Sequence, residues 1–160
     1  MDTGPGSQET VGGPAFKPSE MSEIPVLPDA RHLAARDTLV RKATDALVKH
    51  GIATLVGPSG VGKSTLAKQV AAADRDPWRV LGLRGVDAGA TRLRLLNETG
   101  LMLSGSLAPS YIVDDVGPGS IFYEAAMVTF LATAARLGGR VIVTTYRSAI
   151  KRFVCLRRAG

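Results

Sequence analysis

The sequence has few of the residues that build disulfides, metal clusters and membrane spans. It contains one cysteine and two histidines among 160 residues, which excludes an internal disulfide and indicates no zinc site. No apolar run approaches the roughly 20 residues that cross a bilayer. The N-terminus also lacks the basic and then apolar pattern of a secretory signal. These absences favour a cytoplasmic protein with no membrane partner.

Composition divides the chain into three parts. Residues 1–30 are rich in Gly, Pro, Ser and Thr without apolar periodicity, which predicts a disordered leader. Residues 31–150 alternate helical and strand-like patterns, which predicts one α/β domain, and residues 151–160 form a basic tail. Within the leader, the proline-rich run 24–28 is expected to be extended and to dock on the domain surface.

A glycine-rich octet, residues 57–64, fits the phosphate-binding P-loop pattern G-x-x-x-x-G-K-[ST]. An apolar, β-branched run precedes it at 52–56 and predicts a buried strand, while good helix formers follow it. In this context the backbone N–H groups of the loop are expected to cradle phosphates. Lys63 would reach the β- and γ-phosphates, and the Ser64 hydroxyl would bind Mg²⁺. The plain alternative is a glycine turn with a solvated lysine.

Two adjacent acids lie in the strand predicted over residues 110–116. Ligands of open α/β sheets sit beyond the carboxyl ends of the strands, so both acids are expected to face the nucleotide. Asp114 is placed to hold Mg²⁺ through water, and Asp115 to polarise an attacking water. An Asp-Asp turn without a function is the alternative.

The remaining patterns complete the predicted fold, a P-loop NTPase three-layer α/β fold. Its sheet is expected to be mostly parallel, with about four strands flanked by helices. The last strand ends in Thr144 and Thr145, whose hydroxyls either sense a γ-phosphate or simply suit a strand. Helices are predicted over 36–50, 63–73, 91–102 and 121–137, and the two further strands over 78–83 and 140–145.

Four segments stand in order along the chain: Ala35-Arg36-Asp37, GPSGVGKSTLAKQ, YIVDDV and GGRVIVTTYRSAI. Together they resemble the nucleotide-binding core of the NB-ARC family, signal-transducing P-loop ATPases related to AAA+ proteins. The resemblance spans about residues 24–150 and implies ATP or ADP with Mg²⁺ as ligands. It also implies that the strand at 140–145 lies between the P-loop strand and the strand with the two acids. Tyr146 stands where the family usually has an arginine, and Arg147 comes one residue late.

The resemblance assigns a role to each matching residue. Mg²⁺ is expected at Ser64 and Asp114, and Asp115 matches the catalytic acid. Arg36 matches the arginine of the family's entry motif, although Ala35 replaces its glycine. The expected nucleotide-binding residues are Arg36, Gly57, Pro58, Ser59, Gly60, Val61, Gly62, Lys63, Ser64 and Thr65.

The family continues with a fifth strand, a helical lid and a winged-helix domain, for which these 160 residues leave no room. The predicted sheet is therefore incomplete at the fifth strand, and the strand at 52–56 has an open apolar edge. We expect the leader, the tail, or a protein partner such as a second copy to cover that edge.

Three functions remain open on the sequence. The first is an ATP/ADP-binding module with weak or no Mg²⁺-dependent hydrolysis. The second is a small-molecule kinase in which Asp87 acts as the base for a substrate hydroxyl. The third is a non-enzymatic interaction or nucleic-acid module that uses the basic residues after 146. No aromatic residues interleave with those charges as a stacking platform would require.

Overall fold

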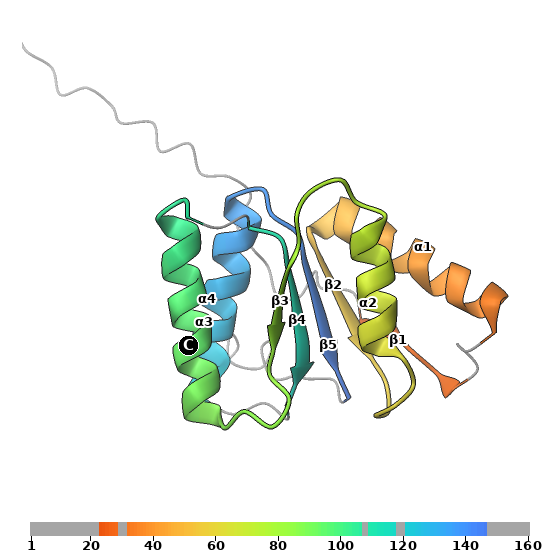
Figure 1. Cartoon of the computed structure of the whole chain (residues 1–160), viewed down its shortest axis with the longest axis horizontal. Helices are drawn as coiled ribbons and strands as arrows, with labels where there is room; N and C mark the ends of the chain where they lie inside the picture. The colour runs from red at the N-terminus through yellow and green to blue at the C-terminus, as the bar shows by residue number, and fades with distance from the viewer. Residues whose placement is uncertain (1–22, 29–31, 107–108, 118–120, 147–160) are drawn as a thin grey trace, which may run out of the picture.

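A five-stranded, all-parallel sheet lies between two layers of helices in the computed structural model (Figure 1). The structure describes residues 23–28, 32–106, 109–117 and 121–146. Its elements are β1 (Glu23–Pro25), α1 (Leu33–His50), β2 (Ile52–Val56), α2 (Lys63–Ala72), β3 (Arg79–Gly82), α3 (Ala88–Leu103), β4 (Tyr111–Val116), α4 (Ile121–Arg136) and β5 (Val141–Thr145).

The strands are arranged in the order β1-β2-β5-β4-β3, so β5 lies between β2 and β4 as expected. This order puts the last strand of the sequence at the centre of the sheet. Val143 on β5 pairs with Thr54 on β2 and with Val113 on β4. The carboxyl ends of β2, β4 and β5 therefore lie side by side at one edge of the sheet (Figure 1).

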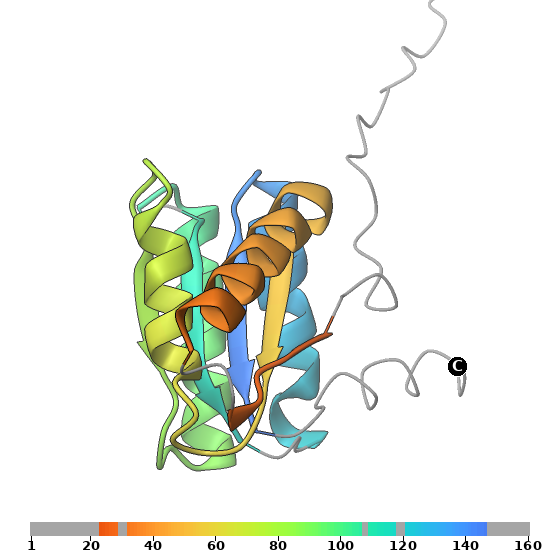
Figure 2. The same ribbon diagram turned by 90° about the vertical axis from the view of Figure 1, so that its right-hand side faces the viewer.

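Each face of the sheet has its own apolar core, with α1 and α2 over one face and α3 and α4 over the other (Figure 2). Side chains of a strand point alternately to the two faces. On β5, Val141 and Val143 join the core under α3 and α4, whereas Ile142 joins the core under α1 and α2. Burial on both faces explains why the central strands are continuous apolar runs in the sequence.

The sheet has five strands where about four were expected, and the additional strand comes from the predicted leader. Residues 23–25 pair with β2 in parallel and cover the edge that the sequence left open. Ile24 and Val26 are buried, and the Val26 N–H donates to the Val56 carbonyl at 2.6 Å. Residues 23–28, assigned above to a disordered leader, therefore pack against the domain. Residues 1–22 and the tail at 151–160 lie outside the described residues.

Most element boundaries agree with the sequence to within three residues, and the differences have local causes. The α3 helix begins at Ala88 because the Asp87 carboxylate accepts the Ala90 N–H at 2.8 Å and caps the helix. The α1 helix ends where Gly51 adopts a left-handed conformation and donates to Leu47. None of the helices in the described parts of the chain is long and apolar enough to cross a bilayer.

The segment that follows the edge strand and the glycine-rich loop after β2 touch through their backbones at Gly57. A Cβ atom at Gly57 would lie 2.2 Å from the Val26 carbonyl oxygen, a distance that real Cβ atoms essentially never show. Either the loop or the edge strand would have to shift to admit a side chain. Glycine at the first position of the loop thus allows residues 23–28 to dock.

We expect Gly57→Ala to lower the free energy of unfolding by about 1–3 kcal/mol through this overpacking. Urea denaturation measures the loss, and the Val26 amide should exchange its hydrogen faster as β1 detaches. Gly100→Ala is the control, because nothing lies within 4 Å of its Cβ position on α3, and it should stabilise the helix by roughly 0.5–1 kcal/mol. Wild-type stability and exchange in Gly57→Ala would contradict the close packing.

Candidate functional site

The loop between β2 and α2 is built on two left-handed glycines. Gly60 has a φ of 78° and Gly62 a φ of 96°, and Gly62 is the N-cap residue of α2. Residues with a Cβ rarely adopt such angles, so glycine is required at both positions. All nine consecutive residues of the expected P-loop set lie together: Gly57, Pro58, Ser59, Gly60, Val61 and Gly62 in the loop, and Lys63, Ser64 and Thr65 in the first turn of α2.

The Lys63 ammonium group is held inside this loop. Its side chain is buried, and Nζ donates to the carbonyl oxygens of Gly57 at 2.9 Å and Pro58 at 2.8 Å. Burial lowers the pKa of Lys63, and the nearby charges of Asp115 and Asp114 partly offset that shift. The lysine is thus a buried cation held by two loop carbonyls, rather than the solvated side chain of the plain alternative.

Hydrogen bonds bring Asp114 to the start of α2. Its Oδ1 atom accepts the Ser64 hydroxyl at 2.8 Å, across 50 residues of sequence. The same oxygen accepts the Thr144 hydroxyl at 2.6 Å. The two residues expected to bind Mg²⁺, Ser64 and Asp114, are therefore in direct contact. The hydroxyl of Thr144 on β5 holds the Asp114 carboxylate in this orientation.

Thr144 also supports the second acid, a role that the sequence did not reveal. Its Oγ1 atom accepts the backbone N–H of Asp115 at 2.8 Å, so one buried hydroxyl serves both acids. The sequence suggested either a γ-phosphate sensor or ordinary strand propensity for the Thr144-Thr145 pair. The neighbouring Thr145 hydroxyl donates to the Val116 carbonyl at 3.0 Å, so both threonines connect β5 to β4.

Asp115 has an unusual backbone conformation. Its φ of 63° makes it the one non-glycine residue with a positive φ among the described residues, and such a conformation is strained by about 1–3 kcal/mol. The pairing of β4 with β5 shifts register between Val113 and Val116, which marks a bulge at the two acids. The Asp115 Oδ2 atom then accepts the Arg84 Nε–H at 2.7 Å. The sequence did not single out Arg84, because its contact arises only when β3 and β4 pair.

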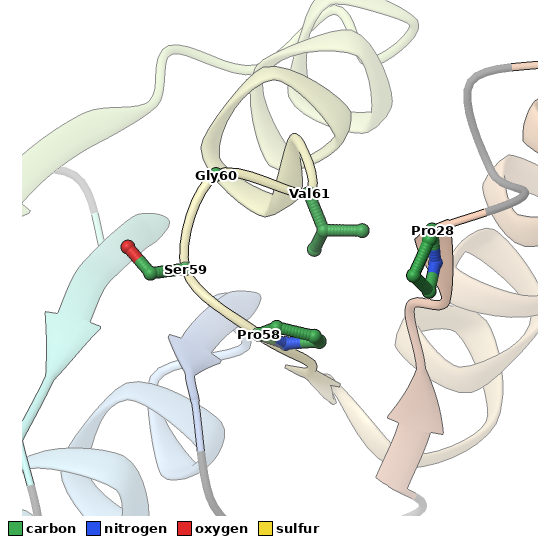
Figure 3. Close-up of a pocket in the computed structure, with 5 residues that line it drawn as sticks. All are labelled: Pro28, Pro58, Ser59, Gly60 and Val61. Atoms are coloured by element: carbon green, nitrogen blue, oxygen red, sulfur yellow. The ribbon is translucent and has the colours of Figure 1, made fainter.

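A pocket of about 340 Å³ lies beside the loop (Figure 3). Pro28, which follows β1, forms one wall, and Pro58 and Val61 contribute apolar surface from the loop. Ser59 and Gly60 complete the lining. Docking of residues 23–28 therefore creates one side of this pocket.

Arg36, expected to bind nucleotide, and Asp87, the base of the kinase alternative, make hydrogen bonds away from the loop. The Arg36 Nε–H donates to Gln69 Oε1 at 2.8 Å and so joins α1 to α2. Asp87, the base of the kinase alternative, is the N-cap residue of α3 and accepts the Ala90 N–H. Neither contact brings these side chains to Lys63 or Ser64.

A separate buried acid, Glu98, has a structural role at the start of β3 and β4. Arg79 donates to both of its carboxylate oxygens at 3.0 Å, and the Tyr111 hydroxyl donates to one of them at 3.0 Å. Burial and this bond to Glu98 raise the pKa of Tyr111 to about 12. Glu98 is thus satisfied by two partners, far along the strands from Asp114.

The candidate site offers oxygen ligands that suit Mg²⁺. This ion usually keeps several waters and is bound by one or two carboxylates together with substrate phosphates. The Ser64 hydroxyl and the Asp114 carboxylate fit that pattern. Within the described residues no cluster of three or more His, Cys, Asp or Glu side chains could hold a metal without such help.

No protein-family model matches the chain, and neither the curated proteins nor the solved structures yield a match. The interpretation of this site therefore depends on its own geometry and on the pattern of its sequence.

We expect Thr144→Val to destabilise the fold by about 1–3 kcal/mol, because it leaves the buried Asp115 N–H and the Asp114 carboxylate short of a partner. Urea denaturation measures the change. Thr99→Val is the matched control: Thr99 is equally buried, but its hydroxyl donates only to Leu95, one turn back on α3. Equal losses in the two variants would contradict the role assigned to Thr144.

Proposed function

We propose that the chain binds ATP or ADP together with Mg²⁺ at the loop between β2 and α2. The observation that carries this proposal is the contact of the Ser64 hydroxyl with the Asp114 carboxylate at 2.8 Å, beside the buried Lys63 ammonium. A glycine turn without a ligand needs neither a desolvated lysine nor a carboxylate at the first turn of its helix. Phosphate binding and Mg²⁺ coordination need both.

Each group has a part in holding the nucleotide. The loop N–H groups and the N-terminus of α2 attract phosphate oxygens, and Lys63 exchanges its two carbonyl partners for the β- and γ-phosphates. Ser64 and Asp114 hold Mg²⁺, which neutralises phosphate charge. The apolar surfaces of Pro28, Pro58 and Val61 provide a place for the base beside the loop. The four segments that resemble the NB-ARC family support a module of that type in the cytoplasm.

Weak hydrolysis of ATP is part of the proposal. Asp115 lies next to the Mg²⁺ ligand, and its carboxylate is 29% exposed, so water can reach it. A carboxylate at this position can orient and polarise a water that attacks the terminal phosphate. Its bulged backbone is held by Thr144, which fixes the carboxylate relative to Asp114.

The alternatives receive no comparable support. A kinase that uses Asp87 as its base would have to release that carboxylate from the N-cap of α3. A nucleic-acid module would depend on the basic residues at 147–160, which lie outside the described residues. No contact of the described residues favours either function over nucleotide binding.

We expect Lys63→Ala to weaken the binding of ATP and ADP by about tenfold or more, because charge-assisted hydrogen bonds to the phosphates are lost. Isothermal titration calorimetry with Mg²⁺ present measures both affinities, with micromolar values expected for the wild type. Lys68→Ala is the matched control, since it removes the same charge from an exposed position on the same helix. Equal affinities in the wild type and Lys63→Ala would overturn the proposed function.

We expect Asp115→Asn to retain ATP binding within about threefold and to abolish Mg²⁺-dependent turnover, because the amide cannot take up a proton from water. Asparagine tolerates the left-handed backbone of this position, so the fold should persist. Release of phosphate over time measures turnover, and Asp45→Ala, an exposed change on α1, serves as control. Undiminished turnover in Asp115→Asn would reject the role of this acid.

A further inference from the structure

A tight turn after β3 holds Arg84 beside the two acids. The Val86 N–H donates to the Leu83 carbonyl at 3.2 Å, and Gly85 has a φ of 68°, so Arg84 is the second residue of a type II turn. The Leu83 N–H donates to the Asp114 carbonyl at 2.8 Å, which fastens this turn to β4. The backbone of Arg84 is thereby fixed next to the candidate site.

The side chain of Arg84, in contrast, is free to exchange its partner. It is 80% exposed, and its contact with Asp115 is an ion pair of 2.7 Å between Nε and Oδ2. Exposed ion pairs add little to stability, because water screens the charges and the side chains lose entropy. Arg84 can therefore exchange Asp115 for a more highly charged anion with only a small loss of free energy.

The two cations of the site approach the same pair of acids. Arg84 donates to Asp115, and Ser64, the residue after Lys63, donates to the adjacent Asp114, so both cations stand next to this pair of acids. A phosphate that passes Lys63 toward Asp115 thus enters the field of Arg84. The planar guanidinium fork suits two oxygens of one phosphate better than a single ammonium does.

We propose that Arg84 distinguishes a nucleoside triphosphate from a diphosphate by moving from Asp115 to the terminal phosphate. This inference rests on the proposed function and concerns a residue outside the P-loop. A diphosphate ends near Lys63 and Ser64, so it leaves Arg84 paired with Asp115. A triphosphate extends toward Asp115, draws the guanidinium away, and exposes the Asp115 carboxylate to water at the same time.

The test compares the dissociation constants of ADP and of a non-hydrolysable ATP analogue, both with Mg²⁺. Arg84→Ala should weaken binding of the analogue by about tenfold, as expected for one charge-assisted contact, and change that of ADP by less than about twofold. Arg84→Lys keeps the charge but loses the planar guanidinium group, so its affinity for the analogue should lie between those of the wild type and Arg84→Ala. Arg92→Ala removes an equal charge from an exposed position on α3 and should change both constants alike.

A double-mutant cycle separates direct phosphate contact from an effect through Asp115. In the Asp115→Asn background the ion pair is absent, yet Arg84→Ala should still weaken binding of the analogue by about tenfold. No further loss in that background would overturn the proposal, because Arg84 would then act only by holding Asp115.

The remaining outcomes distinguish this inference from the proposed function. Equal weakening of both ligands by Arg84→Ala, or no change in either, overturns the role of Arg84 while nucleotide binding stands. A wild-type chain that binds neither ligand overturns the proposed function and this inference with it. Circular dichroism of each variant confirms that the exposed substitution leaves the fold intact.

Discussion

One carboxylate oxygen of Asp114 connects the three elements that form the candidate site. It accepts hydrogen bonds from Ser64 on α2 and from Thr144 on β5, while Asp114 itself belongs to β4. These bonds exist because β5 lies next to β4 and its carboxyl end adjoins the loop after β2. The strand order therefore decides whether the lysine, the serine and the acids meet. An order with β3 between β4 and β5 would move Asp114 away from Thr144 and Ser64.

The bulge at Asp115 lets the adjacent residues Asp114 and Asp115 contact different partners at the carboxyl end of β4. In a regular strand, neighbouring side chains point to opposite faces. Here the left-handed backbone of Asp115 interrupts that alternation. The Asp114 carboxylate accepts a hydrogen bond from Ser64, and the Asp115 carboxylate accepts one from Arg84. The strain is balanced by the Thr144 hydroxyl, which holds the Asp115 N–H. Strained backbone of this kind gathers at functional sites, where precise placement outweighs its energetic cost.

The sequence predicted the parts whose signals are local and missed those that depend on tertiary contact. The glycine-rich loop at 57–62, its flanking elements and the positions of both acids follow from spacing and periodicity. The segment at 24–28 was expected to be extended and to dock, but not to form an edge strand, because three residues carry no period and Pro25 argues against a strand unless it lies at an edge. The hydrogen bonds of Thr144 to the two acids, and the position of Arg84, were missed for a related reason: their partners are set by strand pairing, and residues of their type occur in any strand or turn.

Residues 23–28 and the loop after β2 are in contact through their backbones and through the pocket that they line together. Val26 bonds to the end of β2 and lies against Gly57, while Pro28 lines the pocket with Pro58 and Val61. A ligand that binds this loop and pocket thus favours the docked state of residues 23–28, and by linkage their docking favours the ligand to the same degree. Residues that composition assigned to a disordered leader therefore lie in contact with the candidate site.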